Sequence, residues 1–207
     1  SGLGTLKTAI GSVTSGYGAL KTAIGALGVG FAVKTFISMT EAALDLAGNL
    51  VDTADKIGLS TSSLQELQFA AEQSGVGVES FNDAMTIFTR KLAEAAAGTG
   101  TAKERLVAFG LDAKALAADP AQALTIVAEK IKGITNQGER LDVIRDLFDR
   151  GGAAMVQMLQ AGGPALDALR QKARDLGIVL DEDLLRRSEE VGDQFEAASK
   201  VIDLQFK

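Results

Sequence analysis

The sequence contains no cysteine and no histidine among its 207 residues. Disulfides, thiol nucleophiles and histidine-based catalytic triads cannot form without these side chains. Structural and catalytic zinc sites also draw most of their ligands from these two residues. The absence therefore excludes the commonest nucleophilic, redox and zinc chemistry.

Proline and aromatic residues are scarce as well. The chain has 2 prolines, 1 tyrosine and no tryptophan, whereas 46% of its residues are hydrophobic. Because proline interrupts helices, its scarcity favours helical segments. No stretch alternates polar and apolar residues over enough positions to predict a strand. The sequence therefore predicts an all-α protein.

Basic residues are fewer than acidic ones, and the net charge is −6. The acidic excess lies in residues 57–207, because residues 1–56 contain four basic and four acidic side chains. A protein that holds nucleic acid electrostatically carries a basic patch or stripe. We therefore expect no specific nucleic-acid binding.

Long apolar runs are missing from the N-terminal part. Lys7, Lys21 and Lys34 divide it into pieces of 13 and 12 residues, and a helix needs about 20 apolar residues to span a bilayer. No basic segment precedes a continuous apolar core, as a signal peptide would require. Since residue 1 is serine and the sequence stops within a helical pattern, we expect a fragment of a longer chain.

A heptad repeat occupies this N-terminal part instead. Apolar residues recur at spacings of three and four, and the segment "LKTAIG" occurs at residues 6–11 and again at 20–25. A 14-residue repeat keeps an apolar seam on one side of a left-handed coiled coil. We predict parallel helices that associate through a seam formed by Leu3, Leu6, Ile10, Val13, Tyr17, Leu20, Ile24, Leu27 and Phe31.

Glycine recurs every seventh residue on the outer side of this helix, at Gly4, Gly11, Gly18 and Gly25. Each glycine costs a helix about 1 kcal/mol relative to alanine. Three interpretations remain open. The glycines are drift after duplication of a 14-residue unit, or a smooth face along which another protein slides or packs, or a surface for helix contacts in lipid.

We divide the chain into a glycine-rich heptad segment, residues 1–56, and a helical region, residues 57–207. Ser63 with Glu66 fits a capping box, and Asp119-Pro120 places a cap before proline at the first helical position. With glycines as stop signals, the predicted helices cover 61–73, 79–97, 102–109, 120–136, 139–149, 152–161, 164–176 and 181–207. We expect these glycine-jointed helices to be extended rather than packed together.

Candidate chemistry is sparse. Acidic residues gather at 181–183 and 189–190, but carboxylates at a helix start are explained by the helix dipole. The glycine pairs at 151–152 and 162–163 lack the lysine and serine or threonine of a phosphate loop. We therefore expect no catalytic residue, no cofactor and no metal, and we expect that the chain is not an enzyme.

Two stretches resemble one protein family. Residues 54–111 contain "KIGLS", "FTRKL" and "GTGT" in this order, and residues 142–180 contain "LFDRGG" and "LGIVL". Together they are similar to the conserved region of the tail tape measure proteins of long-tailed, siphovirus-like bacteriophages. The resemblance covers residues 54–200, which is most of the chain.

This resemblance implies a structural protein of the virion that lies in the lumen of the phage tail. Such proteins set tail length, act as a scaffold for tube assembly and leave before the DNA during ejection. The implied partners are further copies of the chain in a homotrimer, the tail tube protein, distal tail or baseplate hub proteins, and the host membrane at ejection. Some members carry a lytic domain, for which residues 1–207 contain no candidate.

Two other classes remain as alternatives. The chain is a helical membrane-active or translocation protein that inserts residues 8–50, or it is a helical linker of a cell-wall lytic enzyme. Leakage of liposomes by residues 1–50 would support the first alternative. Cleavage of peptidoglycan by this chain alone would overturn the expectation that it is not an enzyme.

Overall fold

The computed structural model describes residues 45–183 and 185–187, and the regular structure in these residues is helical, without strands. This confirms the all-α prediction for the described part. Residues 45–57 form a first helix. The helices that follow are α3 (Thr61–Gln73), α4 (Val78–Ala96), α5 (Thr101–Ala108), α6 (Ala113–Ala118), α7 (Pro120–Lys132), α8 (Gln137–Phe148), the 3-10 helix η1 (Asp149–Gly151), α9 (Gly152–Ala161) and α10 (Gly163–Asp175).

The predicted coiled-coil seam, Leu3 to Phe31, lies outside the described residues, as does most of the predicted helix 181–207. The seam and the heptad repeat therefore stay predictions. The division after residue 56 also depends on residues 1–44, so it stays a prediction too.

Local start signals were predicted with mixed success. Asp119 caps α7 as expected, because its carboxylate accepts a hydrogen bond from the Gln122 amide at 3.0 Å. The capping box at Ser63 is wrong. Ser60 is the cap of α3, and its hydroxyl accepts from the Ser63 amide at 3.1 Å. Glu66, the other half of that box, is buried and pairs with another helix instead.

Two helix boundaries also differ from prediction. Asp112 caps the unpredicted helix α6 by accepting from the Lys114 amide at 2.9 Å. The predicted helix 120–136 ends at Lys132. Asn136 has an extended backbone and caps α8 by accepting from the Glu139 amide at 3.1 Å. The helix predicted over 139–149 thus begins two residues earlier, after a short polar cap.

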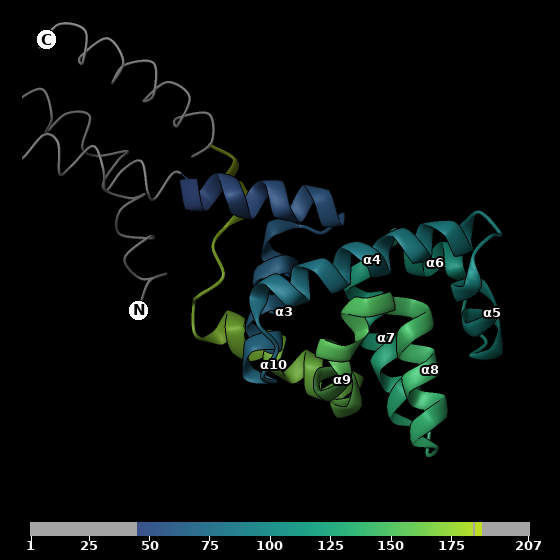
Figure 1. The fold of residues 1–207 in the computed structure, drawn as a ribbon. Coiled ribbons are helices and arrows are strands. Elements are labelled where there is room, and N and C mark those ends of the chain that lie inside the picture. The colour runs from purple at the N-terminus through teal and green to yellow at the C-terminus, as the bar shows by residue number, and fades with distance from the viewer. Residues whose placement is uncertain (1–44, 184, 188–207) are drawn as a thin grey trace, which may run out of the picture. The chain divides into compact units, whose positions relative to one another are not determined.

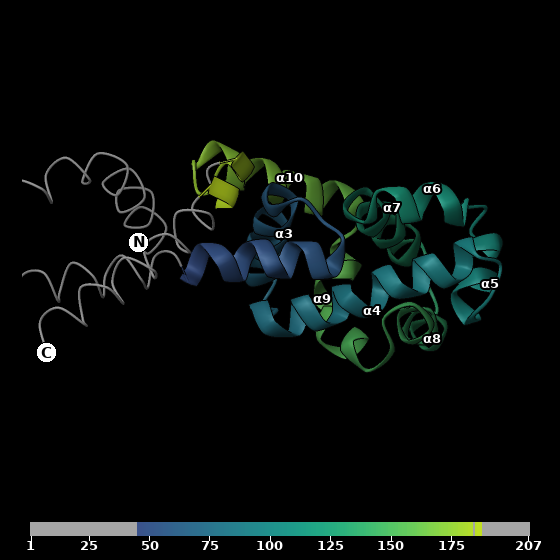
Figure 2. The same ribbon diagram turned by 90° about the horizontal axis from the view of Figure 1, so that it is seen from above.

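The described chain forms two compact units, and each is considered by itself. One consists of residues 53–179. In the other, residues 45–52, 180–183 and 185–187 are described. In the first unit α10 lies beside α3, α4 contacts α5, α6 and α8, and α9 contacts both α7 and α8 (Figure 1, Figure 2). The expected extended arrangement is therefore wrong for residues 57–179.

Helix α4 explains why this region folds back on itself. Phe81, Met85, Phe88 and Leu92 recur at helical spacing and are fully buried. A stripe of this kind must be covered by other apolar faces. The Phe88 ring stacks on that of Phe148 at the end of α8, with ring centroids 4.7 Å apart. Burial of the apolar stripe of α4 therefore favours a packed arrangement, although flexible glycine joints lie between the helices.

The glycine pair at the α8–α9 corner allows close packing. A Cβ atom on Gly151 would lie 2.9 Å from the Cα of Ala84 in α4, and one on Gly152 would lie 2.6 Å from Cγ2 of Ile144. The preceding Asp149 has a positive φ of 51°. The "LFDRGG" stretch is thus a tight corner pressed against α4.

Replacing Gly151 with alanine is expected to lower the free energy of unfolding by about 1–3 kcal/mol, because the added methyl group meets backbone atoms that cannot move aside. Urea unfolding followed by circular dichroism measures this. Gly133→Ala is the matched control. Gly133 has φ −68° and its new Cβ would have its nearest neighbour at 3.4 Å. Equal losses for both variants would contradict the close approach.

Candidate functional site

A partly buried group of charges joins α3 to α10 in the unit formed by residues 53–179. Arg170 and Arg174 are four residues apart, so they share one face of α10. The Arg170 Nε lies 3.0 Å and an Arg174 terminal nitrogen 2.7 Å from the same oxygen of Glu66 in α3. The Glu66 side chain is 7% exposed, that of Arg170 14% and that of Arg174 43%.

Helix α7 is joined to the same group through Asp167. Its carboxylate lies 3.7 Å from Arg170 and accepts a hydrogen bond from the Thr125 hydroxyl at 3.3 Å. We call Glu66, Asp167, Arg170 and Arg174 the α3–α10 charge cluster. Two acids and two arginines balance in charge, which lets the group lie at a helix interface. The arrangement suits holding three helices together.

Replacing Glu66 with alanine is expected to lower the free energy of unfolding by about 3 kcal/mol, since it leaves Arg170 buried without its main partner. This expected loss is near the lower end of the range for breaking a buried ion pair, because the Arg174 side chain is 43% exposed. Urea unfolding measures the change.

Glu94→Ala is the control for this prediction. Glu94 pairs with Arg90 at 2.6 Å, but both side chains are more than a third exposed. Exposed pairs four residues apart contribute about 0.3–0.5 kcal/mol. If the two variants lose the same stability, the cluster does not hold α10 to α3.

The start of α10 is shaped by a second glycine pair. Gly162 has φ +87°, and a Cβ on Gly163 would lie 2.7 Å from the carbonyl oxygen of Thr125. The Gly163 amide donates to the Glu129 carboxylate at 3.0 Å. A carboxylate thus takes the position at a helix N-terminus where a phosphate would otherwise bind. The glycine pair serves the packing of α10 on α7.

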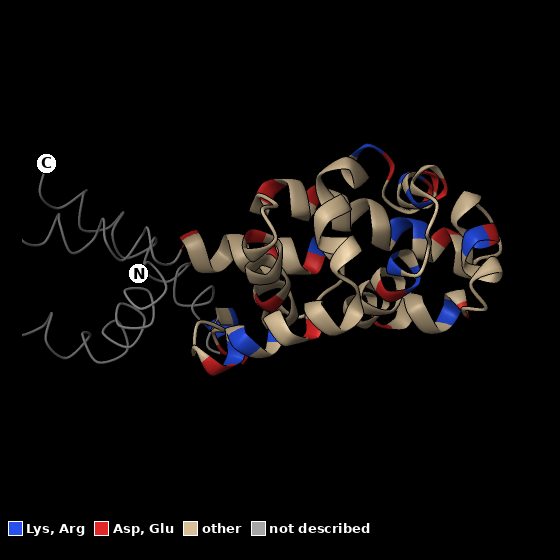
Figure 3. Ribbon diagram, turned by 90° about the horizontal axis from the view of Figure 1, so that it is seen from below, with Lys and Arg blue, Asp and Glu red and all other residues tan. Residues whose placement is uncertain are grey.

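Positions of basic and acidic residues are interspersed along the described helices in the view of Figure 3. Arg105 of α5 and Asp146 of α8 form an ion pair at 2.7 Å. The hydrogen bond to Asp146 raises the pKa of the Arg105 guanidinium. An interspersed surface differs from the one-sided basic stripe of a nucleic-acid-binding protein. Among the described helices, none combines the length and apolar character needed to cross a membrane.

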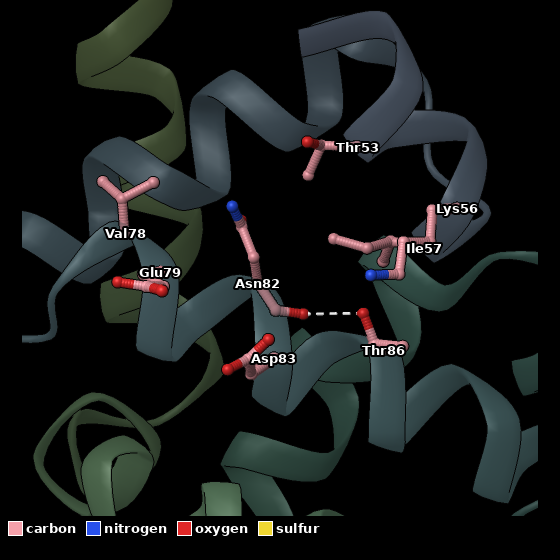
Figure 4. Close-up of a pocket in the computed structure, with 8 residues that line it drawn as sticks. All are labelled: Thr53, Lys56, Ile57, Val78, Glu79, Asn82, Asp83 and Thr86. Carbon is pink, nitrogen blue, oxygen red and sulfur yellow. Dashed lines mark hydrogen bonds between the residues drawn. The ribbon is translucent and has the colours of Figure 1, made fainter. Parts of the chain in front are cut away.

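A hollow of about 410 Å³ lies between the end of the first helix and α4, within residues 53–179. Figure 4 shows Thr53, Lys56 and Ile57 on one wall, with the α4 residues Val78, Glu79, Asn82, Asp83 and Thr86 opposite.

The polar groups of this hollow are partly engaged in the fold. The Thr86 hydroxyl donates to the Asn82 carbonyl oxygen at 2.9 Å, and Oδ1 of Asn82 accepts from Gln68 at 2.9 Å. One lysine and two carboxylates give the walls charges of both signs, which favour no particular class of ligand. Within residues 45–183 and 185–187, no group of three or more acidic, histidine or cysteine side chains could hold a metal ion. The expectation of no catalytic, cofactor or metal residue stays a prediction.

No protein-family model, curated protein or solved structure matches this chain. The fold and the charge cluster together define residues 53–179 as an all-helical unit in which ion pairs join α3 to α10.

The cluster residues were missed in the sequence because Glu66 fits a helix cap. The available signal was its position among Leu64, Leu67 and Ala70 on the apolar side of α3, where a charged residue requires a partner.

Proposed function

We propose that this chain is part of a tail tape measure protein of a long-tailed bacteriophage. In this role it sets tail length, acts as a scaffold for assembly of the tube and is released before the DNA at ejection. The observation that carries the proposal is the ordered resemblance of residues 54–111 and 142–180. The all-helical character of the described residues supports it in a general way.

The positions of the resembling stretches in the fold add support. The "FTRKL" stretch supplies Phe88 and Leu92 to the buried face of α4. The "LFDRGG" stretch supplies Phe148, which stacks on Phe88, and the glycine corner against Ala84. The two stretches therefore belong to one packing unit, although the chain between them is long. A domain shared by a family is the simplest reason for their common order.

The N-terminal heptad segment acts as the rod in this proposal. Three parallel copies associate through the seam from Leu3 to Phe31 and lie in the lumen of the tail. The outer glycines keep the rod thin, so that it contacts the tail tube protein weakly and slides out at ejection. The acidic excess of residues 57–207 opposes adhesion to the DNA that follows. Distal tail or baseplate hub proteins contact the ends, and the host membrane is met on release.

Tail length tests the proposal most directly. Deleting residues 11–24 removes two heptads and leaves the flanking seam in phase, so the tape is expected to shorten by about 21 Å. Three additional copies of this unit should lengthen tails by about 60 Å. Electron microscopy of purified tails measures both, and changes are expected in whole-ring steps because tube subunits add as rings.

The control replaces Gly4, Gly11, Gly18 and Gly25 with alanine. This variant keeps the residue count, so tail length should not change. Mass spectrometry of purified tails establishes that each variant is inside them. Absence of the protein from tails, or unchanged length with the altered protein present, would reject the ruler function of residues 1–56.

A further inference from the structure

The unit formed by residues 53–179 starts and ends with helices that pack on each other. Glu66 of α3 and Arg170 of α10 are 104 positions apart in the chain, yet their side chains are hydrogen-bonded. Arg174, one turn further along α10, contacts the same carboxylate. The last helix of this unit, α10, therefore lies against α3, near the start of the unit.

The segments that flank this unit also meet. Ala47 and Val51 lie one turn apart on the first helix, and they form a buried apolar cluster with Leu180 and Leu185, each at most 2% exposed. Leu50 packs against this cluster. Because Val51 and Leu180 belong to the same cluster, the chain resumes after residue 179 close to the point where it stopped at residue 52.

The length of residues 53–179 as one continuous helix differs greatly from the distance between their two ends in the fold. A continuous helix over residues 53–179 would advance by about 190 Å. Residues whose side chains share one cluster on packed helices lie within about 10 Å of each other. In the folded chain these residues therefore advance a rod by roughly a twentieth of their helical length.

We propose that residues 53–179 are an inserted domain that adds almost nothing to the length the protein measures. The α3–α10 charge cluster holds this domain closed, so that its two ends remain together. The measured length then depends on the chain outside residues 53–179. This inference rests on the proposed tape measure function and deepens it by assigning the length to particular segments.

The decisive variant replaces residues 53–179 with a short glycine-serine linker in the full-length protein of the phage. Tail length should change by less than about 20 Å, close to one 14-residue unit. Shortening by about 190 Å would show that these residues are extended in the tail and would overturn the inference. Deletion of residues 11–24, made in parallel, is the length standard.

The two ideas fail in different ways in this experiment. If the unaltered protein is absent from tails, or if deletion of residues 11–24 leaves tail length unchanged, the ruler function itself is rejected. If that deletion shortens tails as expected while removal of residues 53–179 shortens them by about 190 Å, only the inserted domain is rejected.

A second measurement decides the question when the shortened protein forms no tails. Residues 1–207 contain no cysteine, so within them the pair Glu72→Cys and Lys172→Cys provides two defined sites for spin labels. Both positions are exposed, one on α3 and one on α10. In purified tails we expect a label distance below about 40 Å, from helix length and packing distance. A continuous helix would separate the labels by about 150 Å.

The control pair for this measurement is Glu79→Cys and Ala93→Cys. Both positions are exposed on the single helix α4, so their separation of about 21 Å is the same whether the domain is closed or open. A measured distance for the control pair, together with no measurable distance between residues 72 and 172, would overturn the inference. Short distances for both pairs would support it.

Discussion

Replacing Phe88 with alanine is expected to lower the free energy of unfolding by about 3–5 kcal/mol, the largest stability loss among the substitutions considered. Phe88 is fully buried in the middle of α4, and its ring stacks on Phe148 at 4.7 Å with an angle of 12° between the planes. Its removal leaves a cavity and separates α4 from the end of α8. Urea unfolding of the whole chain, followed by circular dichroism, measures the loss.

The double variant of Phe88 and Phe148 separates ring stacking from burial. The summed stability losses of Phe88→Ala and Phe148→Ala should exceed the stability loss of the double variant by about 0.5–1.5 kcal/mol. This difference is the usual coupling energy of an aromatic pair. Phe88→Leu keeps most of the buried volume and should cost less than Phe88→Ala. A loss below about 1 kcal/mol for Phe88→Ala would show that the α4–α8 contact is not part of the core.

The second large effect concerns association. Changing Ile10 and Ile24 to aspartate places one charge at each of two seam positions in every copy, where like charges would be buried together. We expect the assembly to dissociate, so that the mass measured by ultracentrifugation falls to that of one chain, 21.5 kDa. The resemblance implies a trimer, for which the fall is threefold. Isoleucine at a and leucine at d favour two strands, although Tyr17 and Phe31 also occupy a positions. The seam therefore leaves a dimer open, for which the fall in mass is twofold.

The matched control adds the same charges on the opposite side of the helix. Thr8 and Thr22 lie at outer positions, each two residues before a changed isoleucine, so Thr8→Asp with Thr22→Asp should leave the assembly intact. If the seam variant keeps the mass of the unaltered protein, the seam is assigned to the wrong residues. If both variants dissociate, the added charge and not the seam is responsible.

How far the helices could be predicted depends on how local their signals are. Asp119 followed by Pro120 defines the start of α7 within four residues, and that prediction is confirmed. Predicted and observed limits agree for α3 and α9, where glycine or a polar cap follows the apolar periodicity. Helix α6 is only six residues long, too short for a periodic pattern, and it was missed.

The partners of these helices could not be predicted in the same way. The buried stripe of α4 showed that this helix must be covered, but no local pattern specified α8 or Phe148 as its cover. The extended arrangement was predicted from the glycine joints, the presence of only two prolines and the narrow lumen of a tail tube. The apolar faces pack together instead. The free energy gained by removing them from water exceeds the conformational entropy lost when the flexible joints are fixed.

By itself, the sequence determined that the described residues are helical and, to within one or two residues, where most of their helices begin and end. It also showed that the first 31 residues repeat an apolar pattern every seven. These properties follow from interactions between residues at most a few positions apart. Only the tertiary structure decided that Glu66 pairs with Arg170 and Arg174 and that residues 53–179 close on themselves. Those contacts join positions about 100 residues apart, and the physical reason is that a buried carboxylate needs a cation that only another helix can bring to it.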